Sequence, residues 1–209
     1  MAAKFFSSNH SNVESGAGSR PSRWSSRFLA ALLTLLAAGM AQAFEFQGRH
    51  DIVLHNGGAV RERIGEVEFS PVGDGRARFV VRVDESRLGE YFLAMRPFRC
   101  LVGPEQRLCH FPAAREAPVV GADDLVPLEY ALMFLRTAPA SLHLNPFNGV
   151  YYQLRVGPTR IDGRLYEVDM DPFITPDSVP PERRQRPLRP ADLSPADPAG
   201  HWLPFLSIE

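Results

Sequence analysis

Two cysteines and the histidine that follows the second are the residues of this sequence whose types and spacing best suit chemistry. Cys100 and Cys109 are the only cysteines, and they lie in the stretch RPFRCLVGPEQRLCHFP, which places His110 next to the second one. A nucleophilic site would use Arg96 and Arg99 to lower the pKa of a thiol, with His110 as the base. Two cysteines in a small exported domain are instead typical of a disulfide.

The spacing of the two cysteines favours the disulfide. If Pro104 and Glu105 are the central residues of a turn, Cys100 lies opposite Cys109 at a non-hydrogen-bonded position, where the Cα atoms of two strands approach most closely. His110 follows Cys109 directly, so in a strand the two side chains point to opposite faces. The sequence therefore predicts a structural disulfide and no catalytic residue. Closing this loop should stabilise the fold by about 2.5–3 kcal/mol.

Three carboxylates form the second candidate site. Glu167, Asp169 and Asp171 occupy alternate positions, so they face one way if the strand continues through them. Such a row can bind a hard cation or supply an acid and a base. The alternative is a solvated strand face, because one short run lacks the six or more oxygen ligands that calcium takes. Glu66 and Glu68 form a similar, weaker pair.

Motifs for other chemistry are absent from the sequence. His50 and His55 are spaced so that they face opposite sides of a strand, and His143 and His201 fall in expected loops. The sequence has no H-x-x-x-H zinc pattern, no G-x-S-x-G nucleophile elbow, no P-loop and no G-x-G-x-x-G. No cofactor is therefore expected.

The first 43 residues have the pattern of a secretory signal peptide with a long polar region before it. Arg20, Arg23 and Arg27 precede the apolar run FLAALLTLLAAGM, and the small-residue site AQA ends at Ala43. Cleavage after Ala43 would leave a mature chain that starts at Phe44. The competing interpretation is an uncleaved anchor, although the run is short of the roughly 20 residues that a membrane span needs. We expect a periplasmic or secreted protein with no membrane span in the mature chain.

The charge of the mature chain argues against nucleic-acid binding. The full chain has 23 basic and 24 acidic residues, and the leader contains four of the basic ones and one acidic one, which leaves a net charge of −4. Nucleic-acid binding needs a basic patch that neutralises phosphates, and the arginines here are scattered. The 166 residues after the leader suffice for one domain with a hydrophobic core.

Alternating apolar residues separated by turn signals predict an antiparallel β meander. The apolar parity changes at Gly65, which is typical of a β-bulge. The expected strands of this meander cover residues 44–55, 59–71, 76–84, 91–102 and 107–111. A helix over about 124–136 follows, apolar nearly all round except for Glu129 and Arg136, and it should be buried. A later hairpin joins Val150–Val156 to Ile161–Met170 across the turn GPTR.

The last 38 residues differ in composition. Residues 172–209 are rich in proline and predict an extended arm rather than a second domain. The chain nevertheless ends in HWLPFLSIE, whose apolar side chains are costly to leave in water. We expect this end to dock on the β domain of residues 44–171.

The predicted fold is mainly β: an antiparallel meander that forms a barrel or a strongly curved sheet, with one buried helix. The strand, turn and cysteine pattern resembles small exported β-barrels of the lipocalin-like kind in architecture, and this resemblance carries no motif and implies no function. The expected function is a non-catalytic binding or accessory module of the envelope, using a barrel interior or the cleft beneath the helix. Its partner would be a small apolar ligand or an envelope protein. The alternative is a metal-assisted or acid/base hydrolase that uses Glu167, Asp169 and Asp171.

Overall fold

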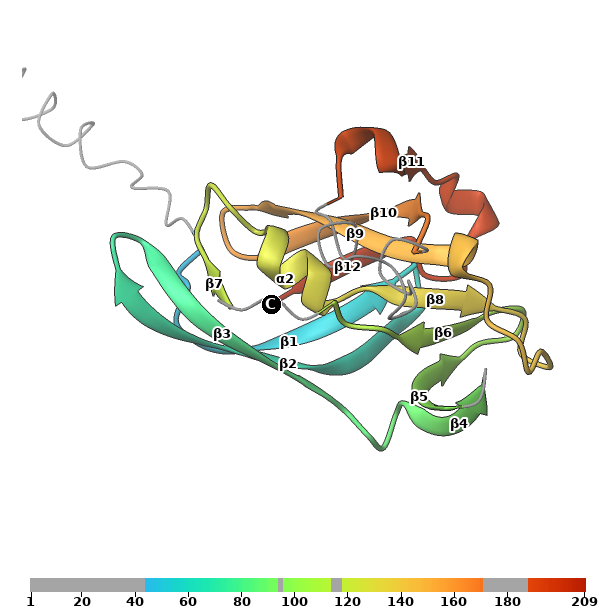
Figure 1. The fold of residues 1–209 in the computed structure, drawn as a ribbon. Coiled ribbons are helices and arrows are strands. Elements are labelled where there is room, and N and C mark those ends of the chain that lie inside the picture. Colours follow the sequence, from blue (N-terminus) through green and yellow to red (C-terminus); the bar gives the residue numbers. More distant parts are fainter. Residues whose placement is uncertain (1–43, 94–95, 114–117, 171–187) are drawn as a thin grey trace, which may run out of the picture. The chain divides into compact units, whose positions relative to one another are not determined.

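The chain folds as one antiparallel sheet in the computed structural model (Figure 1), which describes residues 44–93, 96–113, 118–170 and 188–209. The sheet has twelve strands, and eleven of them follow the order β4-β5-β6-β8-β9-β10-β12-β1-β2-β3-β7, while β11 pairs with β10. The predicted mainly β fold is confirmed at this level. The predicted signal peptide and Asp171 lie outside the described residues.

The strands are short to medium in length, and a single α-helix accompanies them among the described residues. The strands are β1 (Gly48–His55), β2 (Arg61–Gly73), β3 (Arg76–Val83), β4 (Gly89–Leu93), β5 (Arg96–Val102), β6 (Arg107–His110), β7 (Val119–Val120), β8 (Phe134–Thr137), β9 (Gly149–Val156), β10 (Ile161–Val168), β11 (Leu193–Pro195) and β12 (Phe205–Ile208). The helices are α2 (Val126–Ala131) and the 3-10 turns η1 (Pro146–Asn148), η3 (Pro190–Asp192) and η4 (Pro198–Gly200).

The predicted five-strand meander is wrong in two respects. The single strand expected over 91–102 is a hairpin of two antiparallel strands, β4 and β5, and the connection from β3 to β4 does not join paired strands. Strands β1, β2 and β3 pair in sequence order, and so do β4, β5 and β6, but β3 and β4 lie near opposite ends of the sheet. Strands β8, β9, β10 and β12 lie between the two groups, whereas β7 pairs with β3 at the other end of the sheet. The alternating pattern is the same within each group, so the sequence does not reveal that pairing is interrupted between Val83 and Gly89.

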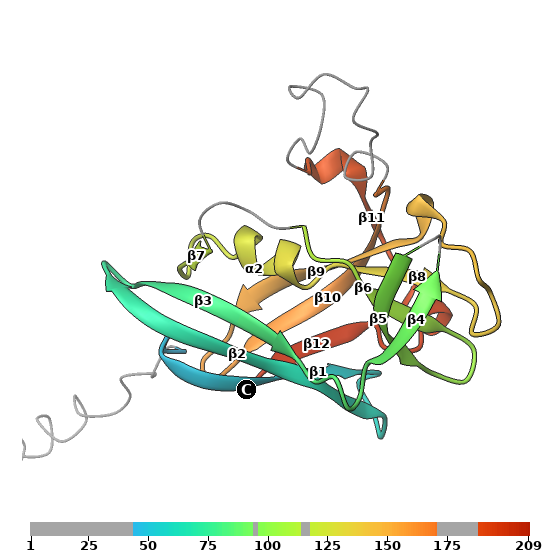
Figure 2. The same ribbon diagram turned by 60° about the horizontal axis from the view of Figure 1, so that its bottom comes forward.

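The connection between β3 and β4 requires the sheet to curve strongly. Only residues 84–88 join these strands, which limits their separation to about 20 Å. Nine strand spacings in a flat sheet would separate them by about 43 Å. The sheet therefore curls so that the end of β3 comes near β4 (Figure 2), but it does not close into a barrel, so the predicted barrel is not confirmed.

A bulge at Gly65 contributes to this curvature, as the parity change predicted. Ile52 pairs with Gly65 and Val53 pairs with Arg63, so one extra residue of β2 lies between the two pairs. A Cβ atom on residue 65 would overlap with the carbonyl oxygen of Arg82 on β3. Glycine is therefore required where the bulged strand approaches its neighbour.

Side chains fill the concave side of the sheet. Tyr152 is fully buried there, and its hydroxyl donates to the carbonyl oxygen of Leu203 at 2.7 Å. The largest completely buried side chains around it are Phe134, Ile52, Leu54, Ile64, Leu128 and Leu132. These side chains form a packed core on this side of the sheet.

A second apolar cluster covers the opposite face of β5, β6 and β8–β10. Tyr151 and Leu135 belong to it, whereas their neighbours Tyr152 and Phe134 belong to the main core. Leu188 and Leu193 of the C-terminal segment pack against this cluster. Strand β8 and the first half of β9 are therefore covered on both faces, whereas Gln153 and Arg155 farther along β9 are less buried.

The predicted helix is shorter than expected. It ends at Ala131, and Phe134–Thr137 form β8, which pairs with both β6 and β9. A run that is apolar on every side suits a buried helix and equally suits a strand covered on both faces. The expected helix over 124–136 is therefore corrected to Val126–Ala131.

The chain end has a larger role than an arm that docks on the surface. Strand β12 lies between β10 and β1 and pairs with both, with Ile208 opposite Ile161 on one side and Ile52 on the other. The preceding residues 188–204 cross the outer face of the sheet and include β11 (Figure 1). The sheet is thus continuous only when the last residues of the chain are in place.

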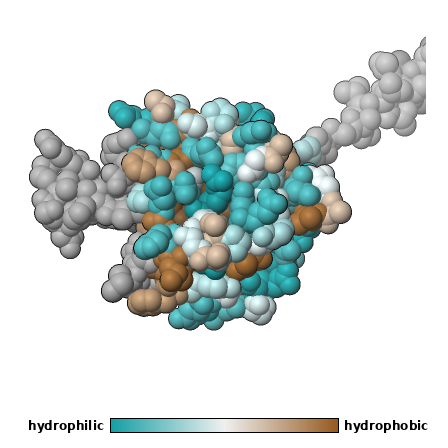
Figure 3. Space-filling view, turned by 90° about the vertical axis from the view of Figure 1, so that its right-hand side faces the viewer, coloured by the Kyte–Doolittle hydropathy of each residue, from teal (hydrophilic) through white to brown (hydrophobic). Residues whose placement is uncertain are grey.

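The surface carries hydrophobic residues without a large continuous patch on the face that Figure 3 shows, where they form separate small areas among hydrophilic ones. The large hydrophobic side chains that are exposed most are Leu142, Phe92, Phe147 and Val72. No helix among the described residues is long and apolar enough to cross a membrane.

Candidate functional site

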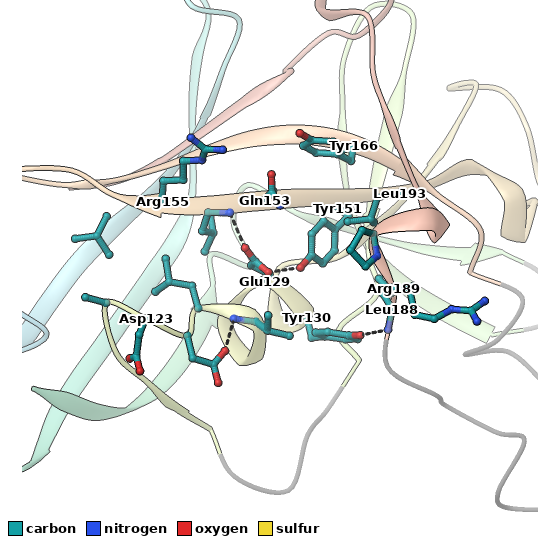
Figure 4. Close-up of a pocket in the computed structure, with 17 residues that line it drawn as sticks. Asp123, Glu129, Tyr130, Tyr151, Gln153, Arg155, Tyr166, Leu188, Arg189 and Leu193 are labelled. Atoms are coloured by element: carbon teal, nitrogen blue, oxygen red, sulfur yellow. Dashed lines mark hydrogen bonds between the residues drawn. The ribbon is translucent and has the colours of Figure 1, made fainter. Parts of the chain in front are cut away.

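A pocket of 690 Å³ lies beside α2 and is the candidate site (Figure 4). Its walls are the loop and first turns of α2, the outer face of β9 and β10, and residues 188–193. The side chains that give it polar character are Asp123, Asp124, Glu129, Tyr130, Tyr151, Gln153, Arg155, Tyr166 and Arg189. The pocket is within the size range of small-molecule sites.

Glu129 lies in the wall of this pocket, and the pairing of β9 explains why a carboxylate is placed there. Strand β8 pairs with β9 only as far as Val150, so the edge of β9 beyond it faces α2 instead of a strand. One carboxylate oxygen of Glu129 accepts from the backbone N–H of Leu154 at 2.7 Å, and the other accepts from the hydroxyl of Tyr151. The helix thus satisfies a backbone group that the sheet leaves unpaired.

The environment of Glu129 favours its protonated form. Burial raises the pKa of the carboxyl, and the hydrogen bonds from Tyr151 and Leu154 offset part of this rise. A carboxyl with a raised pKa in a pocket is often functional. Here both oxygens already have donors, so Glu129 shapes and stiffens the wall rather than serving as a free base.

Four polar side chains of the pocket remain available to a ligand. Gln153, Arg155 and Tyr166 lie on the outer face of β9 and β10, and Asp123 precedes α2. The side chains of these four have no hydrogen-bond or ion-pair partner among the described residues. They offer an amide, a guanidinium, a phenol and a carboxylate around tyrosine rings, which can bind a neutral or mixed-charge ligand that has some apolar surface.

The C-terminal segment supplies the remaining wall. The hydroxyl of Tyr130 accepts from the backbone N–H of Leu188 at 2.6 Å, and Leu188 and Leu193 pack near Tyr151. Residues far apart in sequence therefore meet at the pocket, with α2, β9 and the segment after residue 187 each contributing.

A smaller hollow of 300 Å³ lies on the other side of α2 and is almost entirely apolar. Its one titratable residue is His110, and its other lining residues are Phe79, Val80, Val81, Pro112, Ala113, Pro118, Pro127 and Ala131. The cleft expected beneath the helix corresponds to these two hollows on either side of α2.

The predicted disulfide is confirmed. Cys100 and Cys109 are opposite each other in the β5–β6 hairpin, bonded, with a Cα–Cα distance of 4.0 Å. His110 points to the other face, where its Nε2 lies 2.8 Å from the carbonyl oxygen of Ala131, and burial lowers its pKa. Sulfur and imidazole are thus separated by the sheet, as the alternation of a strand requires.

The predicted carboxylate row is not assembled into the pocket. Glu167 forms an ion pair with Arg136 at 3.0 Å and lies 3.3 Å from Nε2 of His201, and neither it nor Asp169 lines the pocket. Within the part of the chain that the structure describes, no group of three His, Cys, Asp or Glu residues could hold a metal ion. Glu66 and Glu68 form ion pairs with Arg49 and Arg82.

Two features of the sequence point to residues of this pocket without locating it. Glu129 is an acidic residue in an otherwise apolar helix, and Tyr151, Gln153 and Arg155 form the polar side of an alternating strand. Neither signal locates a site alone, because their meeting depends on where α2 lies against β9. Comparisons of the chain with protein-family models, curated proteins and solved structures find no match.

Proposed function

We propose that this chain is a non-catalytic binding protein of the cell envelope and that the pocket beside α2 holds its ligand. The observation that carries the proposal is a set of four groups, Gln153, Arg155, Tyr166 and Asp123, that have no partner within the described part of the chain and surround an open 690 Å³ pocket. A packed interior supports placing the ligand here rather than inside the sheet.

The lining also refines the expected ligand. Tyrosine rings supply apolar surface, while the amide, guanidinium and carboxylate groups require hydrogen-bonding partners, because a ligand that left them unpaired on binding would lose affinity. The ligand is therefore a small molecule with both polar and apolar parts rather than a purely apolar one. A purely apolar ligand suits the smaller hollow around His110 better.

Export supports the envelope as the location. The disulfide is stable in an oxidising compartment, and the leader has the pattern of a signal peptide. We expect a mature chain that starts at Phe44, measured as the intact mass of the protein recovered from the periplasm or medium. A protein that keeps the run before Ala43 and sediments with membranes would contradict this.

The binding proposal is tested with a panel of polar small molecules, read first as shifts of melting temperature. Compounds that stabilise the chain are then mapped by amide chemical shifts. We expect the perturbed amides on β9 and α2. Arg155→Ala should weaken binding about tenfold or more, as loss of a hydrogen bond to a charged group does, and Gln153→Ala about two- to tenfold, as loss of a neutral hydrogen bond does. The matched control is Arg78→Ala, an exposed arginine of β3 with no ion pair among the described residues.

Two outcomes would redirect the proposal. Perturbed amides around Val80 and Pro112 would move the site to the apolar hollow. A large stabilisation by calcium or zinc that Glu167→Gln and Asp169→Asn abolish would favour the hydrolase alternative and contradict a purely binding role.

A further inference from the structure

His201 occupies the junction between the segment that walls the pocket and the central strand β12. The segment of residues 188–204, here called the wall segment, begins at the pocket with Leu188 and ends directly before β12. The His201 side chain is only 5% exposed, although η4 before it is largely exposed. A titratable ring is therefore buried at the point where the wall segment is anchored.

One ring nitrogen of His201 has a partner and the other has none among the described residues. Nε2 lies 3.3 Å from Oε1 of Glu167, and the same oxygen accepts from Arg136 at 3.0 Å. Nδ1 is buried and has no hydrogen-bond partner among the described residues. The charged groups that act on the ring are Arg136 from β8, Glu167 from β10 and Asp197 from η4.

These contacts suit the neutral ring and oppose the charged one. In the neutral form Nε2–H donates to Glu167, and Nδ1 carries no proton that needs an acceptor. Protonation would create a buried N–H donor without an acceptor, beside the positive charge of Arg136. Consistent with this, burial and Arg136 lower the pKa of His201 more than Glu167 and Asp197 raise it.

We propose that His201 is a pH-sensitive latch that keeps the wall segment closed against β8 and β10 at neutral pH and releases it in acid. The consequence for a ligand rests on the proposed function, because Leu188, Arg189, Pro190 and Leu193 of the wall segment line the pocket. Acid would thus open the pocket from its C-terminal side.

The other attachments of the wall segment make a local opening feasible. Gln106 on the β5–β6 turn accepts from the backbone N–H of Trp202 at 3.1 Å and donates to the carbonyl oxygen of Gly200 at 2.9 Å. Strand β11 pairs with β10 over three residues. Leu203 and Pro204 at the end of the segment are held more firmly, because they accept hydrogen bonds from Tyr152 and Leu165, and β12 pairs with two neighbouring strands. The opening therefore involves the residues before Leu203, while these contacts and the sheet remain.

The open state of the wall segment should become more populated as the pH falls, because the two states differ in the pKa of His201. When the segment opens, His201 regains a pKa near its ordinary value of 6.5, whereas in the closed state the pKa is lower. Below pH 6.5 the open state therefore binds the proton first, and the ratio of open to closed segment rises by up to about tenfold per pH unit. The rise stops once the pH falls below the pKa of the closed state.

The test uses the full chain with Trp24→Phe, so that Trp202, next to the latch, is the only tryptophan. We expect acrylamide quenching of Trp202 and deuterium uptake in peptides from 193–204, corrected for intrinsic exchange, to increase between about pH 7.5 and about pH 5, where histidine titrates. Uptake in β12 should not change. An unchanged Trp202 accessibility and uptake over this range would overturn the proposal.

Substitutions around the ring give effects of opposite sign. His201→Gln should remove the pH response. Arg136→Gln should reduce the response, because the protonated ring in the closed state is no longer repelled by the guanidinium. Glu167→Gln should enlarge it, because the protonated ring is no longer attracted by the carboxylate. The control is His55→Gln, which removes another histidine of lowered pKa, on β1. A response that persists in His201→Gln, or that changes in the same direction in the Arg136 and Glu167 variants, would assign it to another group.

The quenching and deuterium-uptake measurements need no ligand, so they test the latch proposal independently of the binding proposal. A segment that opens in acid while no compound binds near Gln153 supports the latch and contradicts the binding proposal. Binding near Gln153 to a chain whose wall segment does not respond to pH supports the binding proposal and overturns the latch.

Discussion

Single buried polar residues hold this chain together where strand pairing stops. Glu129 accepts from Leu154 at the edge of β9 that β8 does not reach. Arg107 is buried on β6, donates to the carbonyl oxygens of Pro139 and Ser141, and lies over the ring of Tyr91 at 4.3 Å from its centroid. Each side chain satisfies backbone groups that a longer strand would have satisfied by pairing.

Removing the carboxylate of Glu129 should therefore destabilise the fold. Glu129→Ala leaves the N–H of Leu154 and the hydroxyl of Tyr151 without an acceptor, and each buried unsatisfied donor costs about 1–3 kcal/mol. Glu129→Gln keeps one acceptor oxygen and should lose less. Urea denaturation measures the difference, and equal stability of the alanine variant and the parent would show that neither bond contributes.

The raised pKa of Glu129 gives the same residue a pH signature. Because the folded state holds this proton more tightly than the unfolded chain does, its contribution to the free energy of unfolding is complete below the ordinary pKa of 4.5 and is lost as the pH rises through the folded pKa. The stability of the parent relative to Glu129→Gln should therefore fall with increasing pH above 4.5. Melts of both proteins across this range measure it, and a constant difference would contradict the raised pKa.

Among the elements, the β5–β6 hairpin is held by a covalent bond close to one edge of the sheet. Cys100 and Cys109 contribute to the second apolar cluster, while Leu101 and Leu108 face the main core. Gly103 and Gln106 close the turn with a 2.8 Å hydrogen bond, and Trp202 packs on Gly103. The hairpin thus carries both the disulfide and a contact to the wall segment.

Replacing both cysteines with alanine should lower the free energy of unfolding by about 2.5–3 kcal/mol from the lost loop constraint. Ligand binding measured well below the new melting temperature should survive, because neither sulfur lines the pocket. The reduced parent protein is the control and should unfold at nearly the same denaturant concentration. A titratable free thiol in the native exported protein, or a stable double variant without function, would argue for chemistry at sulfur.

On the scale of the whole molecule, the last strand of the sequence is an interior strand of the sheet. β12 joins β10 to β1, so it connects the strands of the C-terminal half to the first hairpin. Leu206 and Ile208 are completely buried, and so is Ser207. Without β12, two edges would be exposed in the middle of the sheet.

Deletion of residues 205–209 should therefore abolish cooperative unfolding rather than lower the melting temperature by a few degrees. The deletion removes the backbone hydrogen bonds to both neighbouring strands and two buried aliphatic side chains, each worth about 1.5–3 kcal/mol. Together these losses are comparable to the whole free energy of unfolding of a typical domain. Thermal melts followed by circular dichroism test this. The control is Glu209→Gln, which removes the ion pair to Arg61 and keeps an amide oxygen that can still accept from the hydroxyl of Ser207, and it should cost less than about 1 kcal/mol.

Features that depend on neighbouring residues were predictable from the sequence. The bulge at Gly65 and the register that brings Cys100 opposite Cys109 follow from backbone geometry over a few residues. The mainly β character follows from period-two alternation, which is also local.

Features that depend on distant partners were decided only by the tertiary structure. The separation of β3 from β4, the place of β12 inside the sheet and the end of α2 at Ala131 each depend on which strand lies alongside, and a strand's pattern is the same for any neighbour. The pocket belongs to this class: Glu129, Gln153 and Leu188 meet only because the sheet curls and the C-terminal segment returns across it. Sequence determined the local geometry of this protein, and long-range pairing decided its site, because an alternating pattern shows which side chains share a face of a strand but not which distant segment covers that face.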